Sequence, residues 1–298
     1  MKRFIIVFIF ISNYIFASYL VVGDSANLPI ANDGEIILNP ISIDFSNVEV
    51  SSNGRYIDIP IYVKSDTTEA ISMKMSNILA LTQGSESIGI TLSYRGSSIN
   101  SDVLFTLMND GEGGRDGNTV VGNIRVTIPS VYSAQTYGTY NNKIDMALSS
   151  NNYNSQALNY LNISANVPLV AVAGFDIVSS YTNGQRFLDA TVNYGSFDLN
   201  TKNSIEKSLF IKSNSKQNFK LSFDTTKLVS KINSNYKIPL NYYFNNTPFI
   251  NNQYFTALSG ENTGESTIGV IKFETETISS SLISGSYEAI INVTISLE

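Results

Sequence analysis

The sequence predicts an all-β protein made of two tandem immunoglobulin-like β-sandwiches, and three observations lead to this prediction. The length of 298 residues corresponds to about two domains. The composition is rich in Ser, Thr, Asn, Ile, Val, Tyr and Phe, which favour strands and turns. Apolar residues alternate with polar ones in many short runs, as expected of strands that bury one face.

The missing residue types exclude several kinds of site. The chain has no Cys, no His and no Trp, which removes thiol nucleophiles, a histidine base, disulfides and most zinc ligands. The formal net charge is −6, so no overall basic character attracts nucleic acid. No pair of acidic residues has a spacing that marks it as the acid and base of a glycosidase. We therefore expect no enzymatic activity, no cofactor and no nucleic-acid partner.

The N-terminus has the features of a signal peptide. Lys2 and Arg3 precede an apolar run, and Ala17 is a candidate cleavage residue. The run is too short and interrupted for a comfortable membrane span, although a short membrane anchor is the alternative interpretation. We expect residues 1–17 to be removed and the mature chain to be exported.

An internal repeat predicts the two domains. Short segments recur in the same order at a nearly constant offset of about 150 residues, which chance similarity rarely maintains. Residues 34–39, 43–45, 63–65, 91–94, 122–126 and 138–140 match residues 184–189, 192–194, 211–213, 240–243, 269–273 and 285–287. The polar stretch between the copies contains no hydrophobic period. We assign residues 18–148 to the N-terminal sandwich, 149–159 to a linker and 160–298 to the C-terminal sandwich.

Alternating runs and turn clusters predict the individual strands. Residues 57–63 in the first copy, and 219–223 and 291–297 in the second, have apolar side chains at every other position. Clusters of turn-forming residues separate the runs, as at 95–98 and 245–248. Many short strands separated in this way are typical of sandwiches or barrels.

One predicted strand, residues 160–167, is present in the second copy alone. Its apolar residues alternate with Asn and Ser, and Pro168 ends the run. The repeat offset places its equivalent in the first copy inside the signal peptide. The chain also ends directly after the last strand of the second copy, whereas in the first copy this extra strand follows. The apolar residues that would fill the pockets of a sandwich are Leu161, Ile163, Ala165 and Val167.

We therefore expect residues 160–167 to complete the first sandwich in cis. The second sandwich would then have an open sheet edge and an exposed core groove, which favour pairing with a strand from elsewhere. The alternative interpretation is that residues 160–167 are simply the first strand of the second sandwich.

Residues 160–168, with the sequence YLNISANVP, resemble the N-terminal donor strand of the major pilins of class 5, or alternate chaperone–usher, fimbriae. The resemblance continues in the Asn183-Gly184 turn with the segment that ends at Tyr194, and in Gly285-Ser286-Tyr287 before the last alternating strand. It covers most of residues 160–298, and the later elements of the first copy more loosely. The Tyr- and Asn-rich composition differs from that of the Ala- and Val-rich pilins.

The resemblance implies a function in fibre assembly. In such fimbriae a periplasmic chaperone holds the open groove, and an outer-membrane usher exchanges the chaperone strand for the donor strand of the next subunit. A chain that uses its donor strand internally accepts a strand but does not donate one. The resemblance therefore implies a minor tip subunit, exported through the periplasm to the cell surface. It would join a fimbrial shaft subunit, and its outer domain would be a candidate adhesin for a host glycan.

Two further groups of residues are candidate sites in the first copy. Arginine binds acidic groups of glycans through paired hydrogen bonds, although ordinary surface charge is the alternative. The candidate ligand-binding residues are Arg55, Arg95, Arg115 and Arg125. A glycine-rich loop carries weak candidate Ca²⁺ ligands, although its spacing fits no EF-hand and a solvent-exposed hairpin loop is the alternative. These residues are Asp110, Glu112 and Asp116.

Two other functional classes stay open at this point. The chain would be a non-fimbrial structural surface protein if both sandwiches were closed, or a carbohydrate-active enzyme if acidic residues met across a cleft. The behaviour of residues 169–298 alone discriminates the first alternative, since a closed domain would stay monomeric whereas an open one would bind a strand.

Overall fold

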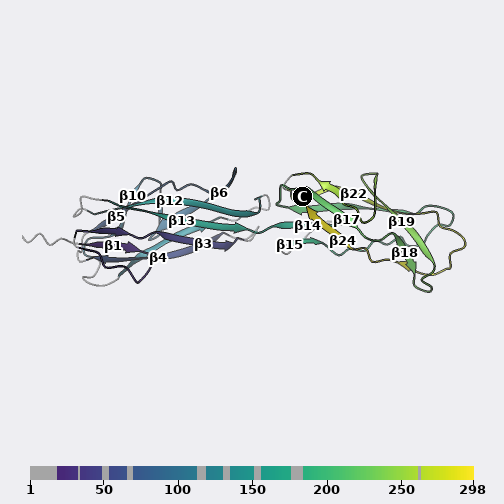
Figure 1. Ribbon diagram of the computed structural model, residues 1–298, viewed down its shortest axis with the longest axis horizontal. Coiled ribbons are helices and arrows are strands. Elements are labelled where there is room, and N and C mark those ends of the chain that lie inside the picture. The colour runs from purple at the N-terminus through teal and green to yellow at the C-terminus, as the bar shows by residue number, and fades with distance from the viewer. Residues whose placement is uncertain are drawn as a thin grey trace, which may run out of the picture.

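The computed structural model describes residues 19–32, 34–48, 54–65, 70–112, 119–129, 135–150, 156–175, 184–260 and 263–298. The regular secondary structure in these ranges consists of β-strands, which confirms the all-β prediction. Two β-sandwiches follow one another along the long axis of the molecule (Figure 1). The described ranges contain no helix long and apolar enough to cross a membrane. The predicted signal peptide, residues 1–17, lies outside them.

The first sandwich is formed by two facing sheets. The first sheet has the strand order β2 (Ile36–Leu38), β1 (Leu20–Gly23), β4 (Arg55–Ser65), β11 (Thr119–Ile128), β8 (Thr91–Tyr94) and β9 (Ser97–Ile99). The second has the order β10 (Leu104–Met108), β5 (Ile71–Ser76), β12 (Gly138–Ser150), β13 (Ala157–Val167) and β3 (Ile41–Asn47). Two short strands extend it beside β12, namely β6 (Leu81–Gln83) and β7 (Glu86–Ile88).

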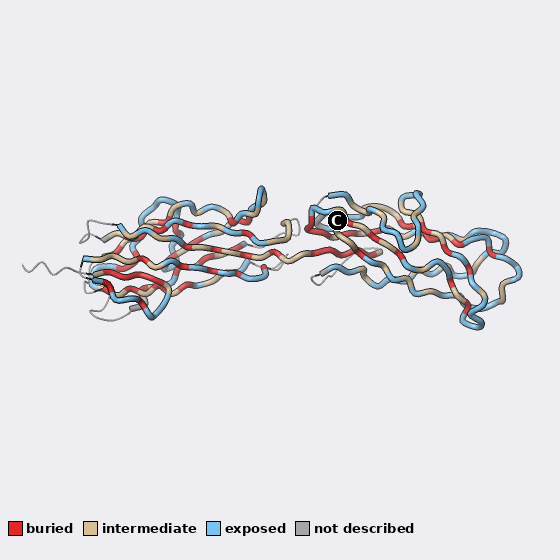
Figure 2. The backbone as a smooth tube through the Cα atoms, in the orientation of Figure 1, coloured by how far each residue is buried: buried red, intermediate tan, exposed pale blue. Residues whose placement is uncertain are grey.

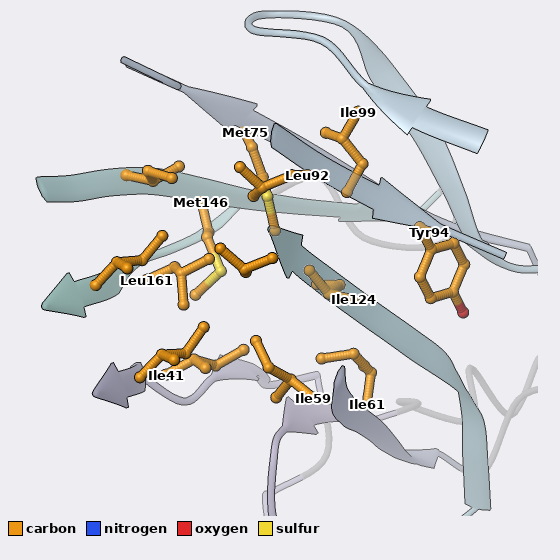
Figure 3. Close-up of a cluster of buried hydrophobic side chains, with 14 of the residues drawn as sticks. Ile41, Ile59, Ile61, Met75, Leu92, Tyr94, Ile99, Ile124, Met146 and Leu161 are labelled. Carbon is orange, nitrogen blue, oxygen red and sulfur yellow. The ribbon is translucent and has the colours of Figure 1, made fainter. Parts of the chain in front are cut away.

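The core of the first sandwich forms where alternating side chains of the two sheets meet. Ile59, Ile61 and Ile124 point inward from one sheet, and Met146 and Leu161 point inward from the other (Figure 3). None of these five side chains is more than 6% exposed. Full burial of an aliphatic side chain of this size contributes about 1.5–3 kcal/mol, so this face of each strand holds the layers together.

The second sandwich also consists of two sheets. The larger has the order β15 (Gly184–Phe187), β14 (Val170–Phe175), β16 (Ser204–Ser213), β22 (Thr263–Thr275), β19 (Lys237–Phe244), β18 (Lys227–Ser230) and β23 (Tyr287–Glu288), with β20 (Thr247–Phe249) beside β19. The smaller has the order β21 (Phe255–Leu258), β17 (Phe219–Phe223) and β24 (Val293–Leu297). Figure 2 shows buried residues running along the strands of the first sandwich, whereas the chain of the second is more often intermediate or exposed.

The strand orders reveal the duplication. The run β2-β1-β4-β11-β8-β9 corresponds to β15-β14-β16-β22-β19-β20, and β10-β5-β12 corresponds to β21-β17-β24. Two predicted matches are wrong by a residue. Leu38 corresponds to Phe187 rather than to Leu188, because Val22 pairs with Leu38 and Val63, and Ala173 pairs with Phe187 and Ile211. Tyr94 pairs with Ile124, and Phe244 pairs with Ile271, so Phe244 rather than Tyr243 takes the place of Tyr94. The register differs from the sequence alignment because the connection before this strand is longer in the second copy.

The predicted domain boundary is also wrong. Residues 149–159 do not link two domains, because Leu148 of β12 pairs with Ala157 of β13 within one sheet of the first sandwich. The strand at 160–167 therefore belongs to the first sandwich and not to a C-terminal unit at 160–298. Both of its neighbours, β12 and β3, come from the first copy. The chain passes to the second sandwich at Pro168, which has no amide hydrogen for a β-ladder.

Asn214 fixes the junction between the sandwiches. Its side chain is fully buried. Its Oδ1 accepts a hydrogen bond from the Val170 amide at 2.8 Å, and its Nδ2 donates to the Pro168 carbonyl at 2.9 Å. Its carbonyl oxygen accepts from the amide of Tyr137 in the first sandwich at 3.1 Å. One residue of the second sandwich thus binds the connecting segment and the body of the first.

Candidate functional site: an open strand position in the second sandwich

The position of β13 in the first sandwich defines the site. β13 runs antiparallel to β12, with Leu161 opposite Ile144 and Ala165 opposite Tyr140. On its other side it runs parallel to β3, with Ile163 opposite Ile43. The strand therefore fills a position between two neighbours that are far from each other in sequence.

The four predicted donor-strand residues lie in the core of the first sandwich. Their side chains are no more than 1% exposed, and all four belong to its main apolar cluster: Leu161, Ile163, Ala165 and Val167. The polar residues between them are half-buried on the opposite face, as the alternation predicts. β13 thus closes the first sandwich from within the chain.

In the second sandwich, no described strand occupies the position that corresponds to β13. β24 corresponds to the end of β12. Among the described residues, β24 pairs with β17 on one side and with no strand on the other. The segment that corresponds to β3, residues 190–196, contains no strand. No described strand therefore pairs with the second edge of β24.

The neighbours of the open position are less regular than their counterparts. β12 is one continuous strand of 13 residues. The corresponding stretch of the second sandwich is divided into β23 and β24, with residues 289–292 outside any strand. Because each strand of a sheet supplies hydrogen-bond partners to the next, a missing strand leaves both of its neighbours unsupported.

A groove of about 1220 Å³, lined by both apolar and polar residues, lies at this position. Segments 187–197 and 282–293, most of whose residues lie outside strands, supply much of its lining, and the core supplies most of the rest. Ile144 and Ile43, beside β13, are 0% and 7% exposed. Their counterparts Ile291 and Val192 are only partly buried. The missing strand therefore leaves apolar side chains in contact with solvent.

Aromatic rings form the floor of the groove. The ring of Phe223 lies within 6.4 Å of the rings of Phe187 and Phe273, both edge-on. Phe175 packs edge-on against Phe187 at 5.2 Å. Edge-to-face packing of this kind stabilises the floor beyond simple area burial. The groove can thus hold apolar side chains on a preformed surface.

Tyr194, Phe197 and Tyr287 are further aromatic residues that line the groove. The Tyr287 hydroxyl donates to the Ile283 carbonyl at 3.0 Å. The Tyr194 hydroxyl is buried and has no hydrogen-bond partner among the described residues. Burial raises the pKa of Tyr194, so this hydroxyl stays protonated at neutral pH. The lining also includes polar residues such as Thr191, Asn193 and Asn292, so the groove combines an aromatic floor with mixed apolar and polar walls.

Three of the four candidate arginines bind partners within the chain. Arg125 forms an ion pair with Asp58 at 2.7 Å, and Arg95 forms one with Glu112 at 2.7 Å. Arg55 donates to the Asn47 carbonyl at 2.5 Å. The structure gives each guanidinium a different local partner and does not direct the three toward one cavity. The fourth candidate, Arg115, lies outside the described residues.

The candidate calcium loop is partly occupied by the same contacts. The Glu112 carboxylate accepts hydrogen bonds from Arg95 and from the amide of Asn109 at 3.0 Å, and these contacts lower its pKa to about 2. Asp110 is exposed, and Asp116 lies outside the described residues. In the part of the chain that the structure describes, no group of three or more acidic residues could hold a metal ion.

Sequence reasoning predicted an exposed groove in the second sandwich, but it named Tyr194 and Tyr287 only as parts of the resemblance and did not assign the residues that line the groove. They can be found by adding the repeat offset to the residues that flank β13. Phe45 then corresponds to Tyr194, and Tyr140 corresponds to Tyr287. The signal was therefore present, but it required knowing which strands flank β13. Alternation alone does not give strand order.

Comparison with known proteins gives matches by structure. No family model matches the sequence, and a search of curated proteins finds no match. A chain of the CsuC–CsuE chaperone–tip adhesion subunit complex, from the archaic chaperone–usher Csu pili of Acinetobacter baumannii, is similar with a TM-score of 0.49 and 11% identity, over 86% of this chain and 97% of that one.

Two structures from enterotoxigenic Escherichia coli are also similar. CfaE, the adhesive subunit of CFA/I fimbria, has a TM-score of 0.31 and 12% identity, over 86% of this chain and 92% of its own. The CooA pilin subunit has a TM-score of 0.34 and 17% identity, over 43% of this chain and 91% of its own. These three structures come from bacterial pili and fimbriae.

Proposed function

We propose that this protein is the tip subunit of a chaperone–usher-type fimbria and that its second sandwich accepts a strand from the neighbouring subunit. The observation that carries the proposal is the unequal filling of one strand position. β13 occupies this position in the first sandwich. In the second, the same position is a groove with an aromatic floor, beside an edge of β24 that no described strand pairs with.

The energetics of the groove favour an incoming strand. Main-chain hydrogen bonds to β24 each contribute about 0.5–1.5 kcal/mol net. Inward side chains would cover the exposed apolar surface, and each fully buried aliphatic side chain contributes about 1.5–3 kcal/mol. β-augmentation uses these two sources together, main-chain bonds for affinity and pockets for specificity.

The use of β13 inside its own chain supports a position at the end of a fibre. Among the described residues, every strand belongs to one of the two sandwiches, so none of these strands is free to enter a neighbour. The proposed partners are a periplasmic chaperone that covers the groove first, an outer-membrane usher, and a shaft subunit that supplies the final strand. The first sandwich would then face outward as the candidate adhesin for a host glycan.

Peptide binding to the full chain tests the proposal. The probe is a set of peptides based on residues 157–168, with Val, Ile, Leu or Phe at the inward positions of Leu161, Ile163 and Val167. We expect saturable one-to-one binding and a higher Tm, because the strand buries the groove. Ile291→Asp, which puts a charge into the groove, should abolish binding. The matched control Thr294→Asp, at an exposed position of β24, should leave binding unchanged.

Two results would count against the proposed function. If no peptide of the set binds and the Tm stays constant, the second sandwich is closed in solution and the chain fits a structural surface protein of two closed sandwiches. If Ile291→Asp and Thr294→Asp bind equally well, the peptide does not enter the groove.

A further inference from the structure

β13 has an outer face that its position in the core does not explain. The inward residues of the strand close the first sandwich, and the alternation places Leu158, Tyr160, Asn162, Ser164 and Asn166 on the opposite side. Leu158 is 72% exposed and Tyr160 is 40% exposed, although the outward positions of such a strand are usually polar. Packing does not constrain these side chains, so they are free to contact a ligand.

The outward side chains of three strands form rows. β12, β13 and β3 lie side by side along the long axis of the molecule (Figure 1). From the junction outward, the rows are Asn141 with Ser164 and Asp44, Lys143 with Asn162 and Ser42, Asp145 with Tyr160, and Ala147 with Leu158. The face is therefore polar toward the second sandwich and more apolar toward its far end.

A hollow of about 580 Å³ lies over the two polar rows. Its volume falls in the range of about 300–1,000 Å³ that is typical of small-molecule sites. The side chains of both rows line it, and Thr82 of β6 borders it beside β12. Ser42, Asp44, Asn141 and Lys143 are exposed, so a ligand can reach the hollow from solvent.

The hollow contains hydrogen-bonding groups that the protein leaves free. The side-chain amides of Asn141 and Asn162 have no hydrogen-bond partner among the described residues. Asp44 Oδ1 accepts from the Ser46 amide at 2.8 Å and from the Ser164 hydroxyl at 3.1 Å, which fixes the carboxylate in place. An amide both donates and accepts, as a sugar hydroxyl does, so these groups can bind adjacent hydroxyls of one ring.

The charges of the lining favour an uncharged ligand. The lining has one carboxylate, Asp44, and one ammonium group, Lys143. The two charges balance, and Lys143 Nζ lies 3.4 Å from the centroid of the Tyr160 ring, a cation–π contact that directs it toward the aromatic row. An acidic group placed in the hollow would lie near the Asp44 carboxylate, which would repel it.

The apolar end of the face fits a sugar better than it fits a protein. A pyranose ring has an apolar side of C–H groups, which can pack on Tyr160 and Leu158. Tyr supplies rigid contact area, and Asn and Ser supply adaptable hydrogen bonds, in surfaces that bind polar ligands. A stable protein interface has an apolar centre within about 800 Å² per partner, which two exposed apolar side chains do not provide.

We propose that the outer face of β12, β13 and β3 binds an uncharged oligosaccharide. One ring would occupy the hollow, with its hydroxyls on Asn141, Asn162 and Asp44, and the next ring would pack on Tyr160 and Leu158. The inference deepens the proposed function and rests on it for the assignment of the first sandwich as an adhesin. It adds the location of the site and the class of sugar.

Binding of defined sugars to the full chain tests the inference. The probe is a set of uncharged oligosaccharides with terminal glucose, galactose, mannose, fucose or N-acetylhexosamine, each paired with a sialylated or sulfated counterpart. We expect at least one uncharged member to bind and its acidic counterpart to bind no more tightly. In a ¹⁵N NMR titration with the tightest uncharged sugar, the shifted amides should lie in residues 42–44, 141–143 and 158–164.

Variants with matched controls locate the site. Asn162→Ala should weaken binding of this sugar at least fivefold, because it removes hydrogen bonds, and Tyr160→Ala should weaken it at least tenfold. Asn123→Ala and Tyr56→Ala are the controls, at exposed positions on the outer face of the other sheet, and should leave binding within about twofold. Tyr56 is 58% exposed and has Arg125 over its ring at 4.1 Å, so it matches Tyr160 in its surroundings. An unchanged Tm shows that each variant is folded.

The outcomes separate this inference from the proposed function. Binding of acidic sugars alone, or unchanged binding by both Asn162→Ala and Tyr160→Ala, would overturn the site on β13 while leaving the first sandwich an adhesin. Failure of every sugar to bind would contradict both the site and the adhesin assignment. Strand uptake by the second sandwich is measured separately by the peptides, so none of these results decides it.

Discussion

Arg95 and Glu112 join two loops of the first sandwich at the scale of single residues. Arg95 has a φ of 48° in the β8–β9 turn. Its guanidinium donates to the Val121 carbonyl and pairs with Glu112 at 2.7 Å. Each of the two paired side chains is about two-fifths exposed, and an ion pair this accessible contributes little. Its role is to hold the turn and the loop before residue 113 together.

The Glu112 pair predicts a pH dependence. The pKa of Glu112 falls from its usual 4.5 to about 2 because Arg95 and Asn109 bind its carboxylate. A lowered folded-state pKa adds stability above about pH 4.5 and loses it as the pH falls toward about 2. We expect Glu112→Gln to lower the Tm at pH 7 and the difference to shrink between pH 4.5 and 2. Thermal unfolding followed by circular dichroism measures this, and a difference that stays constant with pH would contradict it.

The arginine contacts show why the sequence could not predict these residues' roles. Asp58, the partner of Arg125, is 67 positions away in sequence and becomes its neighbour only when β4 pairs with β11. The sequence shows the positive charges but not the carboxylates that come to lie beside them. The candidate ligand-binding role of these arginines stays a prediction, made without knowledge of the carboxylates that pair with Arg95 and Arg125.

β13 is the element that determines how the two copies differ. The alternation of its residues predicted both the strand and its buried face, and the structure places those residues in the core. The boundary prediction failed because alternation specifies a face but not a sheet. Only the pairing of Leu148 with Ala157 shows that the polar stretch after β12 leads back into the same sheet.

A substitution in β13 tests its contribution to the first sandwich. Ile163 is 1% exposed and lies between β12 and β3. We expect Ile163→Ala to lower the free energy of unfolding by about 2–5 kcal/mol, because it removes buried methyl groups and leaves a cavity. Asn162→Ala on the opposite face should change it by less than about 0.5 kcal/mol. Urea unfolding measures both, and equal effects of the two changes would show that β13 does not pack in the core.

The whole molecule combines a closed sandwich with an open one. In the first, β3 and β12 are regular strands on either side of β13. In the second, the corresponding segments are irregular and line a groove. Asn214 holds the junction through hydrogen bonds to both sides, so a strand that enters the groove would be firmly connected to the first sandwich.

Hydrogen–deuterium exchange of the full chain, with and without the tightest-binding peptide, tests the central claim of an open strand position most directly. Without peptide, we expect amides in residues 285–297 to exchange much faster than their counterparts in residues 138–150, because the outer edge of the second stretch is unpaired. With peptide, residues 190–196 and 285–297 should become protected to the level of β3 and β12, while the first sandwich stays unchanged. Equal slow exchange in both sandwiches before the peptide is added would contradict the claim, since it would mean that the second sandwich is already closed.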